Sequence, residues 1–94
     1  MKSVHVVIRG RVQGVAYRAW TRRNAAALEL SGWVRNRADG TVEAVFSGPE
    51  ATVEEMIAAC RRGPMGARVV AIDQRDAATA ELPVRPGFAI APTA

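Results

Sequence analysis

The chain has 94 residues, 49% of them hydrophobic and 23% charged, so it can form one domain, residues 1–94, whose core needs neither a metal nor a disulfide. A single cysteine excludes an internal disulfide and a cysteine metal cluster, which favours a reducing, cytoplasmic location. The net charge of +4 favours anionic partners of any kind, and no segment has the apolar length of a signal peptide or a membrane span.

The first predicted elements are a strand and a helix. Residues 3–9 alternate between apolar and more polar side chains with the period of a half-buried strand. Residues 17–28 carry a stripe at helical spacing, formed by Tyr17, Trp20, Thr21, Ala25 and Leu28. We expect this stripe to face a sheet, with Trp20 packed between the helix and the strands.

A hairpin is predicted next. Strands at residues 32–37 and 41–47 flank Arg37-Ala38-Asp39-Gly40, in which Asp39 and Gly40 serve the turn. The second strand places Val42, Ala44 and Phe46 on one face. Trp33, on the first strand, is expected to pack between helix and sheet.

The second helix is predicted to open at Gly48-Pro49-Glu50 and to stop at Gly63-Pro64. Its apolar stripe consists of Val53, Met56, Ile57 and Cys60. This spacing predicts that Cys60 and Met56 are core residues, so the cysteine is not a nucleophile.

A fourth strand is expected at residues 67–74 and a short last strand at Phe88–Ile90, with a fraying tail after it. The order β-α-β-β-α-β plus a terminal strand predicts an α+β fold. It is the ferredoxin-like split βαβ sandwich, with two helices on one face of an antiparallel or mixed sheet.

The most informative segment joins the first strand to the first helix and reads Gly10-Arg11-Val12-Gln13-Gly14-Val15-Ala16-Tyr17-Arg18. Glycines let the backbone approach a bound group, and the free amides at a helix start attract an oxyanion. Arg18 adds a forked, permanent cation in the first helical turn. The segment is neither a G-x-G-x-x-G nor a Walker loop. On pattern alone the glycines could serve geometry only, and Arg18 could be a surface residue.

Two other residues are ambiguous on the sequence alone. Asn36 precedes the hairpin turn, where asparagine is common for structural reasons. His5 lies on the first strand with no metal-ligating residue nearby in the sequence, so we expect an ordinary strand residue.

The loop closely resembles the signature loop of acylphosphatases. A second match is Gly32-Trp33-Val34-Arg35-Asn36, followed by Asp39-Gly40-Thr41-Val42-Glu43, and the chain length suits a free-standing member of that family. The resemblance implies hydrolysis of a carboxyl–phosphate anhydride without a metal or cofactor, by a monomer whose partners are small acyl phosphates and inorganic phosphate. It implies that Arg18 and Asn36 are catalytic, with Asn36 holding the attacking water. The phosphoryl oxygens would be held by the Arg18 guanidinium and by the backbone amides of Gln13, Gly14, Val15, Ala16, Tyr17 and Arg18.

The chain departs from the family pattern at three places. Tyr17 replaces the usual phenylalanine, so its hydroxyl needs a polar partner or water. Glu29 stands where glycine is frequent, at a cost of about 1 kcal/mol if the position is left-handed. The usual aromatic or basic residue at the last strand is missing, and no acyl pocket is evident, which favours broad acyl specificity.

Two other functions fit parts of the sequence. One is an acylphosphatase-like accessory module that binds phosphate or carbamoyl phosphate, although such domains usually belong to longer chains. The other is a ferredoxin-like nucleic-acid-binding domain. The central strands there would need exposed aromatic residues, whereas the first strand offers His5, Val7 and Arg9, so we expect no nucleic-acid partner.

Overall fold

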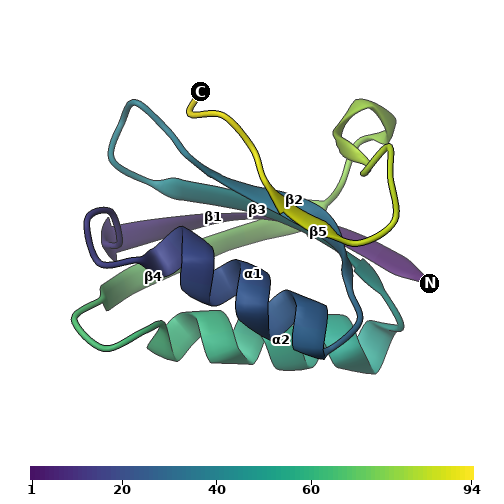
Figure 1. Cartoon of the computed structure of the whole chain (residues 1–94), viewed down its shortest axis with the longest axis horizontal. Coiled ribbons are helices and arrows are strands. Elements are labelled where there is room, and N and C mark those ends of the chain that lie inside the picture. Colours follow the sequence, from purple (N-terminus) through teal and green to yellow (C-terminus); the bar gives the residue numbers. More distant parts are fainter.

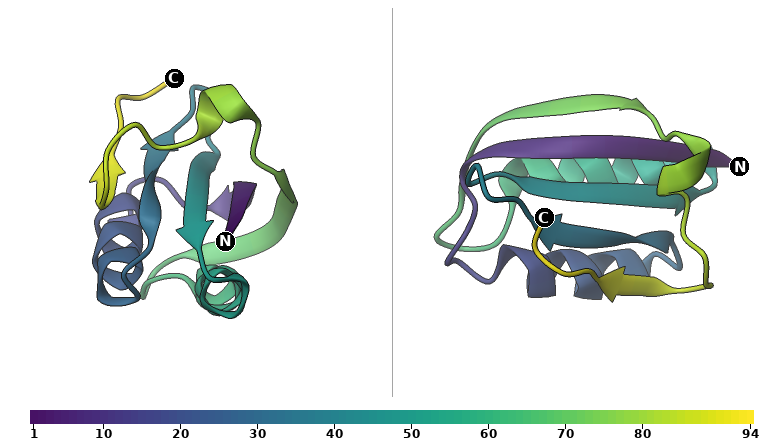
Figure 2. Two further views of the ribbon diagram at one scale, coloured as in Figure 1. Left: turned by 90° about the vertical axis from the view of Figure 1, so that its right-hand side faces the viewer. Right: turned by 90° about the horizontal axis from the view of Figure 1, so that it is seen from above.

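The computed structural model describes residues 1–94 and consists of a single sheet with two helices against one of its faces (Figures 1 and 2). The elements in chain order are β1 (Lys2–Arg11), α1 (Tyr17–Ala27), β2 (Ser31–Asn36), β3 (Val42–Gly48), α2 (Glu50–Arg62), β4 (Arg68–Asp76), the 3-10 turn η1 (Thr79–Glu81) and β5 (Phe88–Ile90). The strand order is β4-β1-β3-β2-β5, and all neighbours are antiparallel except β2 and β5. This confirms the predicted ferredoxin-like split βαβ arrangement. None of its helices has the length and apolar character to cross a bilayer.

The core lies between the sheet and the helices, where the predicted stripes meet. Alternate residues of β1 and β3 face the helices because successive side chains of a strand point to opposite faces. On the helix side, Tyr17, Thr21 and Ala25 of α1 are buried. The predicted stripe of α2 is buried as well, which confirms Met56 and Cys60 as core residues.

Burial along β1 differs from the prediction. The alternating pattern predicted a half-buried strand, but every residue from Val4 to Ile8 is buried. His5 and Val7 face away from the helices, and the exposed fractions of these two residues are only 4% and 8%. Side chains of the neighbouring strands and the η1 segment cover this outer face. The η1 segment is more than seventy residues away along the chain, so the alternation of side chains within β1 cannot predict that it covers this face.

Trp33 lies on the outer face of the sheet, so the prediction that it packs between helix and sheet is wrong. Its neighbour Val34 points into the core, and alternation therefore directs Trp33 the other way. The indole Nε1–H donates to the Glu81 carbonyl at 2.8 Å, and the Arg35 guanidinium lies 4.8 Å from the ring centroid. Trp20, by contrast, is half-buried against the core as expected.

The tail after Ile90 does not fray in this structure. It continues alongside β2, with the Ala91 N–H donating to the Val34 carbonyl at 2.8 Å and the Ala94 N–H donating to the Asn36 carbonyl at 3.0 Å. The Ala38 N–H in turn donates to the Ala94 carbonyl at 2.7 Å. The tail therefore holds the end of β2 that carries Asn36.

Tyr17 and Glu29 both behave as the sequence predicts. The Tyr17 hydroxyl donates to the Cys60 carbonyl at 2.5 Å, which joins the start of α1 to α2. Glu29 is left-handed, with φ at 58°. The Glu29 N–H donates to Ala26 and the Leu30 N–H to Ala25, at 3.0 and 2.9 Å, which is the Schellman pattern of a helix end that glycine usually completes.

Replacing Glu29 with glycine should therefore raise the free energy of unfolding by about 1 kcal/mol, because glycine adopts the left-handed conformation without the steric cost of a Cβ. Urea denaturation measures the change. The matched control is Ala26→Gly, an exposed position in right-handed helix, where glycine should cost about 0.5–1 kcal/mol. A lower free energy of unfolding in Glu29→Gly would contradict this prediction. It would show that the Glu29 side chain stabilises the fold by more than the left-handed backbone destabilises it.

Candidate active site

The loop between β1 and α1, the first turn of α1 and the ends of β2 and β5 enclose a cavity of about 270 Å³. In Figure 1 this is the end of the molecule where the loop after β1 turns into α1, beneath the β2–β3 hairpin. The cavity is lined by Val12, Gln13, Gly14, Ala16, Tyr17, Arg18, Ala19, Asn36 and Ile90. Both predicted catalytic residues thus meet in one cavity, together with most of the predicted loop.

The loop presents backbone donors that the protein itself does not use. None of the N–H groups of residues 13–16 donates a hydrogen bond to a backbone or side-chain acceptor. The Tyr17 and Arg18 amides follow in the first helical turn, where N–H groups have no intrahelical partner. Unpaired donors of this kind bind an anion, so this backbone is ready to receive one. The Val15 side chain does not line the cavity and packs against the core instead.

The N-terminus of α1 carries no compensating negative charge. Its N-cap residue, Ala16, is left-handed with φ at 61° and offers no side-chain cap, and no acidic residue lies in the first turn. The positive end of the helix dipole therefore remains uncompensated at the cavity. Ala16 is one of two non-glycine residues with positive φ in the chain, and a strained backbone of this kind is often found at a binding site.

Arg18 holds an unpaired, half-buried guanidinium at the cavity wall. It makes no ion pair and no side-chain hydrogen bond, although Arg9, Arg35 and Arg75 each bind a carboxylate elsewhere in the fold. A cation without a partner at the wall of a cavity favours a bound anion. Its planar fork matches the oxygens of a phosphoryl group.

Asn36 closes β2 and reaches the same cavity. Its Oδ1 is the only buried side-chain nitrogen or oxygen atom in the protein without a hydrogen-bond partner. An unpaired buried acceptor is unfavourable unless a small polar molecule satisfies it, and a water molecule can donate to it. An amide also adds no negative charge that would repel an incoming anion.

The Gln13 side chain, whose role the sequence did not suggest, fixes the loop to the hairpin. Its Nε2 donates to the carbonyls of Arg37 and Thr41, at 2.8 and 2.9 Å. Arg37 directly follows Asn36, so this carboxamide sets the position of the loop relative to Asn36. The pairing joins residues 24 and 28 positions apart, which local pattern reading does not detect.

Replacing Gln13 with methionine, which has a similar length but no donor, should lower kcat about tenfold by letting the loop shift relative to Asn36. It should also cost about 1 kcal/mol of unfolding free energy, because both carbonyls keep another donor from the hairpin. Steady-state kinetics and urea denaturation of the same preparation check both effects. Unchanged kcat together with lower stability would restrict Gln13 to a structural role.

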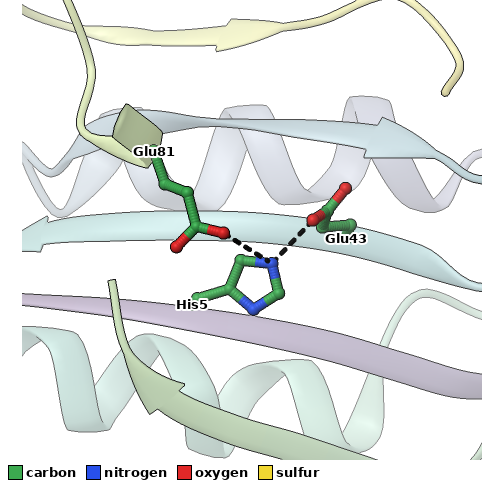
Figure 3. A group of neighbouring side chains, drawn as sticks. All are labelled: His5, Glu43 and Glu81. Carbon is green, nitrogen blue, oxygen red and sulfur yellow. Dashed lines mark hydrogen bonds and ion pairs between the residues drawn. The ribbon is translucent and has the colours of Figure 1, made fainter. Parts of the chain in front are cut away.

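A second group of polar side chains lies on the outer face of the sheet, away from the cavity. His5, Glu43 and Glu81 converge there from β1, β3 and η1 (Figure 3). His5 Nε2 lies 2.6 Å from Glu43 Oε2 and 3.7 Å from Glu81 Oε2, so the ring donates its Nε2–H to the Glu43 carboxylate. The sequence expectation of an ordinary strand residue did not include the two carboxylates that folding brings to His5 from β3 and η1.

Arginines balance both carboxylates of this group. Arg35 donates to Glu43 at 2.7 Å, and Arg75 donates to both oxygens of Glu81 at 2.7 and 2.8 Å. Burial alone would raise the pKa of Glu43, but the hydrogen bonds from His5 and Arg35 outweigh it and lower the pKa. A divalent cation here would have to displace the Nε2 proton and compete with two guanidinium groups. We therefore assign the group to holding η1 on the sheet. In this position η1 covers central strands that a ferredoxin-like nucleic-acid-binding domain would leave exposed.

The pKa of Glu81 is lowered from 4.5 to about 2, chiefly by the hydrogen bonds from Arg75 and then by the Ala78 N–H. A lowered carboxylate pKa stabilises the fold at pH values above about 4.5, and this contribution disappears as the pH falls toward 2. Wild type should therefore exceed Glu81→Gln in unfolding free energy by a constant amount above pH 5, and the gap should close between about 4.5 and 2. Urea denaturation across this range measures the gap. Arg75→Gln should remove most of the same acid dependence, and a gap that does not change with pH would contradict the assignment.

Comparison with known proteins places this geometry in a family. The acylphosphatase family model matches residues 4–90. An acylphosphatase of Nitrobacter hamburgensis is 59% identical over 83 residues, covering 87% of this chain and 84% of the relative. An acylphosphatase of Rhodospirillum rubrum is 55% identical over 93 residues, covering 99% of both chains.

Solved structures agree with the sequence relatives. The crystal structure of acylphosphatase from Bacillus subtilis superposes with a TM-score of 0.88 at 32% identity, over 97% of this chain and 99% of that one. Full-length HypF, at 23% identity and a TM-score of 0.84, shares the fold over 12% of its own length. Because the family model matches residues 4–90 and acylphosphatases align with it in sequence and in fold along nearly their whole length, the chain belongs to the acylphosphatase family, whose members hydrolyse acyl phosphates.

Proposed function

We propose that this acylphosphatase binds the phosphoryl group of an acyl phosphate through Arg18 and the loop amides of residues 13–18, and that Asn36 positions the attacking water. The observation that carries the proposal is the convergence of unpaired groups on one cavity. These are the free N–H groups of the lining residues Gln13, Gly14 and Ala16, the unpaired Arg18 side chain and the unpaired Asn36 Oδ1. Each lacks a partner that a phosphoryl oxygen or a water would provide.

The proposed reaction is an in-line displacement at phosphorus. The water oxygen forms a bond to phosphorus while the bond between phosphorus and the acyl oxygen breaks, and the electron pair leaves with the carboxylate. Arg18 and the amides neutralise the charge on the three remaining phosphoryl oxygens. No strong base is required, because a carboxylate is a good leaving group and a phosphoryl oxygen can take the proton that the water loses.

The same proposal extends to the state of the protein. Residues 1–94 act as one domain and, in this proposal, as a monomer, since one copy of the chain supplies every group that the proposed reaction uses. Its partners are small acyl phosphates and inorganic phosphate. A reducing, cytoplasmic compartment suits its single buried thiol.

Hydrolysis of benzoyl phosphate by purified protein in excess EDTA tests the proposal, with inorganic phosphate added as a competitor. We expect turnover that EDTA does not reduce and competitive inhibition by phosphate. Absence of turnover in a folded protein that still binds phosphate would contradict it. Such a result would favour the accessory phosphate- or carbamoyl-phosphate-binding module instead.

A further inference from the structure

The cavity has an apolar side that the phosphoryl group does not use. The polar groups of the cavity are assigned to phosphate and water in the proposed function. Ala19 of α1 and Ile90 of β5 also line the cavity and have no assigned role. Ile90 is 42% exposed, so part of its side chain is free to contact a ligand in the cavity that it lines. An apolar wall beside a set of polar donors is the usual composition of a small-molecule site.

The fold directs Ile90 toward the cavity. Phe88 and Ile90 point to the same face of β5 because they are two residues apart. The Phe88 ring stacks on Phe46 in the core, with 5.5 Å between ring centroids, so this face is the helix side of the sheet. Ala19 follows Arg18 directly on α1, and both line the cavity with Ile90.

The distance between Ile90 and Asn36 suits an in-line reaction. Ile90 pairs with Val34 on the neighbouring strand, and Asn36 is two residues further along β2. The two strands are parallel, with a spacing of about 4.8 Å and a rise of about 6.6 Å over two residues, so the two positions lie roughly 8 Å apart. In the reactant complex, the attacking oxygen is about 3–3.5 Å from phosphorus, and two further bonds lead to the acyl carbon, roughly 5–6 Å in all. A phosphoryl group between the two side chains therefore places water at Asn36 and the acyl carbon near Ile90.

We propose that Ile90 and Ala19 form an acyl subsite, which selects acyl phosphates with an apolar aromatic or branched acyl group over those with a small or polar one. This inference rests on the function proposed above and replaces the expectation of broad specificity. A large apolar acyl group that packs against Ile90 removes apolar surface from water, which favours binding. The methyl group of acetyl phosphate removes much less. The preference arises in the acyl half of the substrate only, so phosphate itself binds independently of Ile90.

The test compares benzoyl phosphate with acetyl phosphate as substrates of wild type and Ile90→Ala. We expect kcat/KM for benzoyl phosphate to fall about tenfold in Ile90→Ala, and kcat/KM for acetyl phosphate to change less than about twofold. The inhibition constant of inorganic phosphate should stay within about twofold of wild type. Ile90→Thr, which keeps a β-branched residue in the strand, should show the same selective loss.

The matched control is Ala89→Ser, an exposed neighbour on the opposite face of β5 that does not line the cavity. It should leave both substrates and phosphate inhibition unchanged. An equal fall for both substrates in Ile90→Ala would overturn the proposal, because it would assign Ile90 to shielding the attacking water. No change with either substrate would overturn it as well. Wild type that hydrolyses neither substrate would instead contradict the function itself.

Discussion

Replacing Arg18 with glutamine should lower kcat/KM for benzoyl phosphate by about 10³-fold or more and should also abolish inhibition by inorganic phosphate. Both effects follow from one cause, because in the proposed mechanism the guanidinium binds the phosphoryl oxygens in the substrate, in the transition state and in the product. No other arginine lines the cavity, so no second cation can substitute for it. Arg18→Lys should recover only a small part of the activity, since a point charge cannot make the paired contacts of a planar fork.

The control for Arg18 is Arg22→Gln, which removes an exposed arginine from the same helix one turn later. It should retain wild-type kcat/KM and phosphate inhibition, and both variants should unfold at urea concentrations close to wild type. If Arg22→Gln lost as much activity as Arg18→Gln, the net charge of the helix would explain the result. Full phosphate inhibition in Arg18→Gln would show that the loop amides suffice for binding.

Replacing Asn36 with alanine should lower kcat by about 10²–10³-fold while inorganic phosphate still inhibits with a constant near that of wild type. In the proposed mechanism kcat and phosphate binding separate, because Asn36 acts on the water and has no part in holding phosphate. Asn36→Asp should also lose kcat, and it should weaken phosphate binding as well because a carboxylate repels the anion. Steady-state kinetics with benzoyl phosphate, with phosphate as the competing ligand, distinguishes the two variants.

Asn24 supplies the matched control, since it is the chain's other asparagine and its Nδ2 donates within α1 to the Trp20 carbonyl at 2.8 Å. Asn24→Ala should leave kcat unchanged. Stability must be measured beside activity, because removal of the Asn36 side chain also removes an unpaired buried acceptor and should not destabilise the fold. Retained kcat in a folded Asn36→Ala would exclude the water-positioning role.

The features that the sequence predicts correctly are local ones. Helical spacing identified the buried stripes of both helices, whereas the left-handed conformation of Glu29 was only raised as a condition, through the resemblance to a family that often has glycine there. The Gly10–Arg18 segment could be identified because strand end, glycines, helix start and arginine are adjacent in sequence. Asn36 could be assigned a role only through the resemblance, since an asparagine before a turn has a structural explanation of its own.

The features that the sequence does not predict depend on contacts between distant segments. A two-residue period shows that Trp33 and Val34 point to opposite faces, but not which face the helices cover. Ile90 reaches the cavity because β5 adds to the sheet beside β2, 56 residues after Val34 in sequence. His5 meets Glu43 across 38 residues, and the burial of β1 on both faces has the same long-range origin.

The rate at which the Cys60 thiol reacts can measure how often the structure around it opens. The Tyr17 hydroxyl holds this part of α2 against the start of α1 by donating to the Cys60 carbonyl. The Cys60 thiol is completely buried. Burial raises its pKa to about 12, although the Tyr17 hydroxyl lowers the pKa by a smaller amount. At neutral pH the thiol is therefore neither ionised nor accessible to disulfide exchange. Reaction with an external reagent requires the buried thiol to become exposed, and the Tyr17 hydroxyl joins the Cys60 backbone to the start of α1, where the β1–α1 loop ends. A ligand that binds only the closed form makes such exposure rarer in proportion to its occupancy. The proposed binding of phosphate by the β1–α1 loop therefore predicts that inorganic phosphate slows the thiol exchange of Cys60 without contacting it.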